Sequence, residues 1–211
     1  MAECADRPAP ADESAPRLLP WDSAVQAILR CAAARARTGR IVIGIGGPVA
    51  SGKTMLAERL SDCVISTDAY LPDYDRVPHH ERDEPHHADL ARLEQDLLAL
   101  RAGRETRVPV WSFKTHRREG FRLVGPAPVI VCEGIHALHE RVASALDVAV
   151  YVEAPKEVRL ARWRAREASG ARGWSVEFAS SFFHEVAEPT FNRYAPSYRL
   201  RADIIVKNDE G

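Results

Sequence analysis

Short apolar runs alternate with amphipathic stretches along most of the chain. The runs have the length and composition of buried strands, and the stretches between them repeat apolar residues at helical spacing. Strands are predicted at residues 41–45, 63–66, 108–113, 128–132, 148–152 and 204–206. Helices are predicted at residues 21–38, from the turn after the first strand to 60, at 90–100, in an arginine-rich segment from 155, and at 175–194 with an interruption or bend near 189. This alternation favours a mainly parallel sheet covered by helices on both faces, a three-layer α/β/α fold.

Two segments lack any periodicity. Residues 1–20 are rich in proline, alanine and acids, so we predict a flexible N-terminal tail followed by a single domain over residues 21–211. Residues 70–87 are polar, contain three prolines and predict a long loop. Its histidine pairs, at 79–80 and 86–87, have no accompanying cysteine, and we interpret them as solvated rather than as metal ligands.

Composition excludes several classes of protein. Of 211 residues, 45% are hydrophobic and 28% charged, which excludes a wholly disordered chain. The 29 basic and 30 acidic residues nearly cancel, so a general nucleic-acid-binding surface is not expected, which leaves a local basic cluster open. No apolar run approaches the roughly 20 residues of a membrane span, and residues 1–20 lack the apolar core of a secretory signal. The four cysteines form no C-x-x-C pair, which indicates reduced thiols and a cytoplasmic protein.

Residues 47–54 read G-P-V-A-S-G-K-T, after a predicted strand and at the start of a predicted helix. This is the phosphate-binding pattern G-x-x-x-x-G-K-[ST] in its proper context. Its glycines let the backbone curl so that the N–H groups face phosphate oxygens. Lys53 can reach the β- and γ-phosphates, and the Thr54 hydroxyl can bind Mg²⁺. We therefore predict an ATP–Mg²⁺ site that includes Gly47, Ala50, Ser51, Gly52, Lys53 and Thr54.

Two carboxylates follow predicted strands and should lie at the same edge of the sheet. Asp68 can accept the proton of an attacking hydroxyl and can help to bind the metal ion. Glu133 ends an apolar strand, which is the arrangement of an acid that bonds a metal ion or its waters. Asp68 is our candidate base, and Thr54, Asp68 and Glu133 are our candidate metal ligands.

Four arginines are candidates for binding the transferred phosphoryl group. Arg159, Arg162 and Arg166 share one face of the predicted helix, and Arg172 follows in a glycine-flanked segment. Guanidinium groups there stabilise the charge of the transition state. His116 follows an extended segment with two aromatic residues, a pattern that suits either an acceptor pocket or simple alternation of core and surface.

The order and spacing of these motifs resemble the uridine kinase / phosphoribulokinase family of P-loop kinases, from about residue 41 to residue 206. Residues 46–54 look like its G-G-x-x-x-S-G-K-T, and 67–70 like its D-x-F-Y, whose Asp is the base. Residues 83–89 resemble D-H-P-D-A-F-D, whose first Asp binds ribose hydroxyls. Residues 108–116 resemble I-P-x-Y-D-F-x-x-H, which lines the nucleoside pocket, and 132–135 resemble F-E-G-I. Residues 159–166 resemble the lid helix and 172–173 its R-G.

This resemblance implies a P-loop NTPase-type fold with a small acceptor-binding insertion and a helical lid. It implies roles for Lys53, Asp68, Arg162 and Arg166 in catalysis and for Arg172 in ATP binding. The acceptor residues that it implies are Tyr70, Asp83, Trp111, Phe113, His116 and Ile135. The chain departs from the family where Trp111 replaces a tyrosine, and where Trp163 and Trp174 stand in place of arginines near the nucleoside.

The sequence therefore predicts a kinase that transfers the γ-phosphoryl group of ATP to a hydroxyl of a small molecule. A uridine- or cytidine-like nucleoside is the leading acceptor, and a pantothenate-like alcohol or a sugar derivative is the alternative. A non-catalytic nucleotide switch is a third reading, although no D-x-x-G or N-K-x-D motif of a GTPase is present. The tryptophans predict that uridine and cytidine are poor acceptors and that a larger, more apolar or modified one is better. The oligomeric state stays open, a homo-oligomer included.

Overall fold

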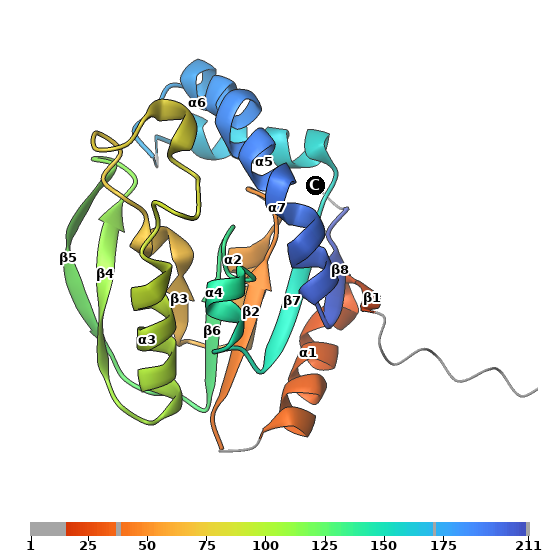
Figure 1. The fold of residues 1–211 in the computed structure, drawn as a ribbon. Helices are drawn as coiled ribbons and strands as arrows, with labels where there is room; N and C mark the ends of the chain where they lie inside the picture. The colour runs from red at the N-terminus through yellow and green to blue at the C-terminus, as the bar shows by residue number, and fades with distance from the viewer. Residues whose placement is uncertain (1–15, 37–38, 171, 210–211) are drawn as a thin grey trace, which may run out of the picture.

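The computed structural model describes residues 16–36, 39–170 and 172–209. Within them, six strands form one sheet in the order β1-β8-β7-β2-β6-β3 (Figure 1), and every neighbouring pair is parallel. These strands are β1 (Arg17–Pro20), β2 (Ile41–Gly46), β3 (Val64–Ser66), β6 (Val129–Glu133), β7 (Val148–Glu153) and β8 (Ile204–Lys207). The predicted mainly parallel sheet is confirmed.

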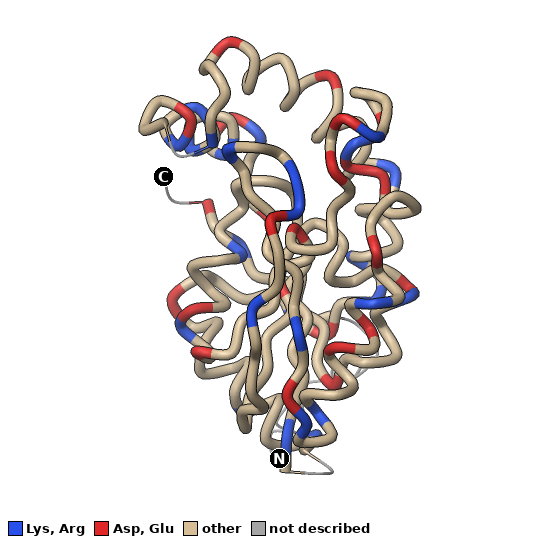
Figure 2. The backbone as a smooth tube through the Cα atoms, turned by 90° about the vertical axis from the view of Figure 1, so that its left-hand side faces the viewer, with Lys and Arg blue, Asp and Glu red and all other residues tan. Residues whose placement is uncertain are grey.

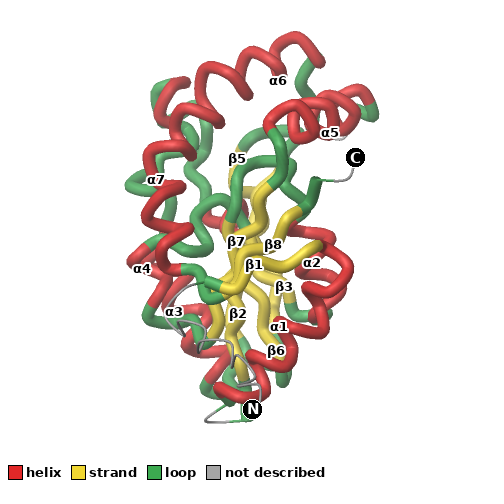
Figure 3. The backbone as a smooth tube through the Cα atoms, turned by 90° about the vertical axis from the view of Figure 1, so that its right-hand side faces the viewer, coloured by secondary structure: helices red, strands yellow, loops and turns green. Residues whose placement is uncertain are grey.

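Helices cover both faces of this sheet, as Figure 3 shows. One face carries α1 (Trp21–Arg35) and α2 (Lys53–Leu60), and the other carries α3 (Leu90–Arg101), α4 (Glu140–Ala143) and α7 (Glu188–Arg201). Because successive side chains of a strand point to opposite faces, Ile43 and Ile45 of β2 pack in the core with Ile28, whereas Val42 packs with Leu93. The predicted three-layer fold is confirmed.

The carboxyl ends of the parallel strands meet at one edge of the sheet, and a helical layer lies over that edge. This layer contains α5 (Lys156–Ala168) and α6 (Val176–Phe182), and a π-helical stretch, η3 (Phe183–Ala187), joins α6 to α7 (Figures 1 and 3). The predicted irregularity near Pro189 is this stretch, since proline lacks an N–H and its ring crowds the carbonyl four residues earlier. The helix then continues to Arg201, beyond its predicted end. None of the described helices has the length and apolarity to span a bilayer.

The predicted end of the flexible tail, at residue 20, is wrong. Residues Arg17–Pro20 form the edge strand β1, in which Leu18 pairs with Ile205 and Pro20 with Lys207 of β8. A strand of four residues can form at a sheet edge through its backbone groups alone, so it leaves no alternation in the sequence. Residues 1–15 lie outside the described residues.

A two-stranded antiparallel hairpin, β4 (Thr106–Ser112) and β5 (Arg117–Val124), stands beside α3. The sequence predicted β4 but not β5, because β5 carries three arginines and only its last residue is buried. Figure 2 shows the hairpin nearest the viewer, with its basic positions in blue. Together with the loop that contains the short helices η1 (Thr67–Tyr70) and η2 (His79–Glu81), the hairpin accounts for the predicted insertion.

Candidate active site

A cavity of about 430 Å³ opens at the carboxyl ends of the strands, and its lining includes side chains of α5 and α6. Part of its wall is the glycine-rich turn between β2 and α2, where Ala50 and Gly52 have φ angles of 58° and 101°. Such left-handed residues curl the backbone into an anion-binding concavity. The Ser51 hydroxyl is buried and has no hydrogen-bond partner among the described residues, which suits a phosphate oxygen as its partner. Gly47 lies behind the turn, where a Cβ would collide with the Val152 carbonyl oxygen.

Lys53 begins α2 and is buried, with its Nζ donating a hydrogen bond to the Pro48 carbonyl oxygen at 2.8 Å. Burial lowers the pKa of this ammonium group to about 8, while the nearby charges of Glu133 and Asp68 oppose that change. The side chain is therefore held across the turn as a positive charge that a phosphate group would further stabilise.

Three oxygen-bearing side chains meet beside Lys53. Thr54 Oγ1 donates to Glu133 Oε2 at 3.3 Å, and Asp68 lines the same part of the cavity from η1. Burial and the neighbouring Asp68 charge both raise the pKa of Glu133, so a divalent cation between the two acids would relieve their repulsion. Hydroxyl and carboxylate oxygens are the ligands that Mg²⁺ prefers, and this donor set therefore fits the predicted metal ion.

The arginines of α5 divide into two groups. Arg159 is buried and forms a bidentate pair with Glu188, with Nη2 2.9 Å from Oε2, so it stabilises the packing of α5 on α7 and does not line the cavity. Arg162 and Arg166 do line the cavity. Arg162 donates to Asn208 Oδ1 at 3.2 Å. Burial and the charge of Arg172 lower the pKa of Arg166, which indicates a crowded positive end of the cavity.

Asp83 also lines the cavity, close enough to Asp68 for the two charges to interact, and it is 5% exposed. The Tyr74 hydroxyl donates to Asp83 Oδ1 at 3.4 Å. Burial and the Asp68 charge raise the pKa of Asp83 to about 7. A buried carboxyl group in this position can accept hydrogen bonds from the hydroxyls of an acceptor.

Four rings in the lining of the cavity pack against one another, and we call Tyr74, His116, Trp174 and Phe182 the aromatic shelf. The ring centroids of His116 and Trp174 lie 4.6 Å apart, and those of Tyr74 and His116 lie 5.5 Å apart, with 12° between the planes in both pairs. Phe182 of α6 lies 4.9 Å from Trp174. The shelf therefore joins the loop, the hairpin and the helical layer through stacked surfaces.

The polar groups of the two tryptophans next to the shelf are already bonded to backbone oxygens. Trp163 Nε1 donates to Ala179 at 2.9 Å, and Trp111 Nε1 donates to Pro72 at 3.1 Å. Arg172 lies over two rings, with its guanidinium carbon 4.0 Å from the Phe113 centroid and 5.2 Å from that of Trp163. The N–H groups of these two tryptophans are therefore already satisfied by the backbone, whereas the rings of the shelf present their faces to the cavity.

The cavity brings together most of the residues that the sequence predicted. Those that line it are Ala50, Gly52, Lys53, Thr54, Asp68, Asp83, Phe113, His116, Glu133, Ile135, Arg162, Arg166 and Arg172. Two predicted acceptor residues do not line it. Tyr70 is fully buried under α3, where its hydroxyl donates to Asp96 Oδ2 at 2.8 Å. The Trp111 ring packs against the Tyr74 ring, with centroids 5.0 Å apart, and so supports the shelf without lining the cavity.

The sequence missed Leu71, Tyr74 and Asn208, all of which line the cavity. Leu71 and Tyr74 lie in a loop that has no periodicity. Asn208 follows β8, and its Nδ2 donates to the Ser51 carbonyl oxygen at 2.8 Å, so it holds the glycine-rich turn. Its position just past a strand at the edge that carries Asp68 and Glu133 was the signal that could have identified it.

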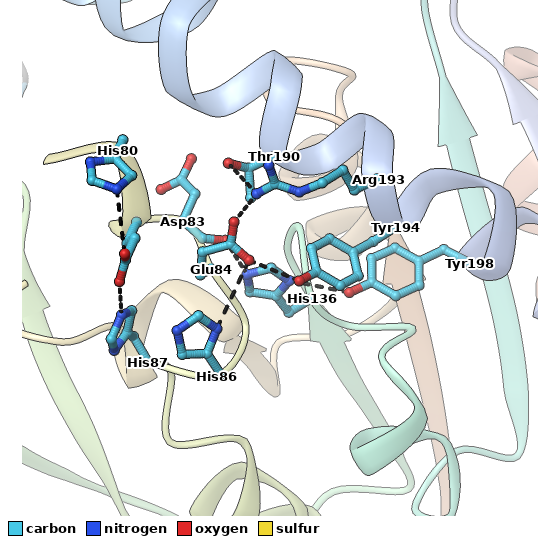
Figure 4. Close-up of polar contacts among 11 residues, drawn as sticks. His80, Asp83, Glu84, His86, His87, His136, Thr190, Arg193, Tyr194 and Tyr198 are labelled. Carbon is cyan, nitrogen blue, oxygen red and sulfur yellow. Dashed lines mark hydrogen bonds and ion pairs between the residues drawn. The ribbon is translucent and has the colours of Figure 1, made fainter. Parts of the chain in front are cut away.

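A polar network behind the cavity holds the Asp83 loop (Figure 4). His136 is buried, and one ring nitrogen, Nε2, lies 2.9 Å from the Asp83 carbonyl oxygen while the other, Nδ1, lies 3.3 Å from the Tyr198 hydroxyl. Because a carbonyl oxygen only accepts, Nε2 carries the proton and Nδ1 accepts from Tyr198. Burial lowers the pKa of His136 to about 3, which keeps this ring neutral. The neighbouring Glu84 pairs with Arg193 and accepts from Tyr194 at 2.8 Å, so α7 also anchors the loop.

Comparisons with known proteins agree with this geometry. The family model described as Phosphoribulokinase / Uridine kinase family matches residues 70–209. The uridine/cytidine kinase UKL1, chloroplastic, of Arabidopsis thaliana is 30% identical over 180 residues, which cover 78% of this chain and 37% of that protein. The uridine kinase of Shewanella amazonensis is 30% identical over 184 residues, which cover 79% of this chain and 86% of that protein. This chain thus spans little more than a third of the plant relative but most of the bacterial one.

A solved structure from Silicibacter sp. TM1040, described as a fructose transport system kinase, has the same fold. Its TM-score is 0.69 at 20% identity, and the match covers 86% of this chain and 98% of that chain. These matches confirm the fold and the family resemblance that the sequence motifs indicated.

Proposed function

This chain belongs to the Phosphoribulokinase / Uridine kinase family, and we propose that it transfers the γ-phosphoryl group of ATP to a hydroxyl of a nucleoside-like acceptor. The observation that carries the proposal is a single cavity whose lining includes Lys53 and Thr54 of the glycine-rich turn, Asp68, and the four rings of the aromatic shelf. A phosphoryl donor on the turn and a ring on the shelf would place the acceptor hydroxyl near Asp68.

In the proposed step, the acceptor oxygen attacks the γ-phosphorus and its proton passes to the Asp68 carboxylate. The new P–O bond forms as the bond from the γ-phosphorus to the β–γ bridging oxygen breaks, and ADP leaves with that oxygen. Lys53 and the backbone N–H groups of the turn bind the phosphates. Arg166 and Arg162 stabilise the charge on the transferred group, because their side chains face the cavity above the turn.

Mg²⁺ is part of this proposal because Thr54, Asp68 and Glu133 offer the hard oxygen ligands that it prefers. When bound, the ion neutralises charge on the β- and γ-phosphates. We also place the activity in the cytoplasm, where buried free thiols such as Cys63 and Cys132 stay reduced.

The acceptor end supports a planar ring over a flexible alcohol such as a pantothenate-like molecule. Stacked His116 and Trp174 present aromatic faces, and Asp83 is placed to accept bonds from a diol. The indole N–H of Trp163, which lines the cavity, is bonded to the backbone and so is not available to the polar edge of a pyrimidine. We therefore propose that stacking and the diol select the acceptor, and that uridine and cytidine themselves bind weakly.

An ADP-release assay with a panel of acceptors tests this proposal. The panel holds uridine, cytidine, nucleosides with larger apolar groups on the base, pantothenate and sugar alcohols. We expect the ring-bearing diols to be phosphorylated, with the apolar-substituted nucleosides giving the highest kcat/KM. Higher kcat/KM for pantothenate or a sugar alcohol than for every nucleoside would favour the alternative acceptor, and ATP binding without any acceptor-dependent turnover would favour a nucleotide switch.

A further inference from the structure

The three acids of residues 81–84, in the loop between η1 and α3, point to three different places. Asp83 faces the cavity, and Glu84 pairs with Arg193 and Tyr194 of α7. Glu81 faces away from both, toward histidines of its own loop. Its carboxylate has no part in the proposed phosphoryl transfer.

Two histidine side chains contact the Glu81 carboxylate, and a third histidine lies next to one of them. His87 Nε2 lies 2.7 Å from Glu81 Oε2, and His80 Nε2 lies 3.4 Å from Oε1, the other carboxylate oxygen. The ring of His86 lies against that of His87, with centroids 4.1 Å apart. Figure 4 shows His80 and His87 on either side of the carboxylate to which both are joined, and His86 next to His87.

The possible ligand atoms of Glu81, His86 and His87 all lie within 4.8 Å of one another. In a tetrahedral zinc site with bonds of about 2.0–2.2 Å, neighbouring ligand atoms are about 3.4 Å apart. The three side chains would therefore shift by about 1.5 Å or less to bind one ion. They have room for this, since the side chains of His86 and His87 are 61% and 26% exposed and that of Glu81 is 34% exposed.

The backbone that carries these ligands is already folded into consecutive turns. Glu84 N donates to the Glu81 carbonyl oxygen at 2.9 Å, and His87 N donates to the Glu84 carbonyl oxygen at 3.1 Å. The Glu84 side chain is also fixed to α7. Because these turns and the Glu84 contacts fix the backbone of the loop, little conformational entropy remains to be lost on binding.

We propose that Glu81, His86 and His87 bind a divalent transition-metal ion of the zinc class, with water at the remaining position. Two imidazoles and one carboxylate suit zinc and its neighbours rather than Mg²⁺ or Ca²⁺, which prefer oxygen ligands alone. The interpretation of these histidines as merely solvated did not foresee the turns, which bring residue 81 next to residues 86 and 87. The site is separate from the proposed Mg²⁺ ligands and does not depend on the proposed function.

One consequence does rest on that function. Asp83 lies between the ligands Glu81 and His86 in the chain, so an ion bound there stiffens the segment that carries Asp83. We expect removal of the ion to raise the KM for the acceptor more than the KM for ATP.

The binding itself is tested with Zn²⁺ and Co²⁺ on the full chain, without nucleotide. Isothermal titration gives stoichiometry and affinity, and NMR of the imidazole nitrogens identifies the histidines that bind. The variants are Glu81→Gln, His86→Gln and His87→Gln. His184→Gln is the matched control, because His184 is exposed on η3 and forms no such cluster with the other residues that the structure describes.

We expect one ion per chain with shifted His86 and His87 resonances, unchanged affinity in His184→Gln, and more than about tenfold weaker binding in each of the three variants. Even loss of an outer partner of a metal ligand typically costs about 10- to 100-fold in affinity. Equal Zn²⁺ affinity in the wild type and the three variants would overturn the proposal, as would binding that disappears only in Asp68→Asn. Thermal melts of the metal-free variants establish that each is folded.

Discussion

The imidazole of His116 and the indole of Trp174 lie face to face, with ring centroids 4.6 Å apart and 12° between the ring planes. His116 follows β4 with a φ of 54°, and Trp174 follows Gly173 at the start of the segment that leads into α6. The pair thus closes the hairpin against the helical layer. Both rings line the cavity, so a ligand that binds between these parts of the molecule meets this stack.

Trp174→Ala should weaken acceptor binding without changing the ATP end of the cavity. Aromatic pairs contribute about 0.5–1.5 kcal/mol beyond their buried area, so we expect the KM for a ring-bearing acceptor to rise about 2- to 13-fold. The KM for ATP should stay nearly constant. Steady-state kinetics with each substrate varied in turn measure both values. Phe121→Ala removes a half-exposed ring on the outer hairpin and is the control, and an equal rise in both variants would contradict a specific role for the shelf.

Asp68→Asn keeps the shape of the side chain but removes the proton acceptor. A general base contributes about 10²- to 10⁴-fold, so we expect kcat to fall by that factor. ATP affinity should be largely kept, because the glycine-rich turn and Lys53 carry most of that binding. Equilibrium binding of a fluorescent ATP analogue, measured beside kcat, separates the two effects. A loss of affinity as large as the loss of kcat would make Asp68 mainly a metal ligand.

Arg159 and Arg166 lie on the same helix and should respond differently to the same substitution. Arg159→Met leaves Glu188 buried without its partner, and breaking a buried pair in this way costs about 3–5 kcal/mol of unfolding free energy. Arg166→Met should leave stability nearly unchanged and lower kcat, because Arg166 lines the cavity. Urea denaturation and kinetics on both variants test this contrast. Full stability in Arg159→Met would show that the ion pair does not hold α5 to α7.

His136 should make the protein more sensitive to acid. Its pKa is about 3 in the folded chain and near 6.5 when exposed, so the unfolded chain binds one more proton between these values. Stability due to this group is therefore complete above pH 6.5 and falls with pH, by about 2 kcal/mol between pH 7.5 and pH 5. His136→Gln keeps a donor for the Asp83 carbonyl oxygen and removes the titration. Its unfolding free energy should fall less over this range, and parallel pH profiles for the two proteins would contradict the assignment.

The parts of the cavity lining that could be predicted from the sequence are local. The glycine-rich turn is a contiguous pattern between a strand and a helix, and Asp68 and Glu133 directly follow apolar strands, so their convergence follows from a parallel sheet. The arginine face of α5 followed from helical spacing, but spacing could not separate Arg159, which pairs with Glu188, from Arg166, which faces the cavity.

The features that the sequence could not predict lie in segments where apolar and polar residues show no regular spacing. Tyr74 reaches the cavity from an irregular loop, whereas Tyr70, which the family motif indicated, points to Asp96. The turns that bring Glu81 to His87 are equally invisible in the pattern of apolar and polar residues. The strand β1 pairs with β8 through backbone atoms, so its side chains carry no pattern that would have predicted it.

The most direct test of the account is acceptor-dependent transfer of phosphate from ATP, followed by mass spectrometry of the product. The wild type is compared with Lys53→Ala, which removes the charge held across the glycine-rich turn but leaves the core intact. We predict a singly phosphorylated ring-bearing diol from the wild type, formed faster for base-modified nucleosides than for uridine, and a rate lower by orders of magnitude in Lys53→Ala. No phosphorylated acceptor from the whole panel, or equal rates in the two proteins, would contradict the account.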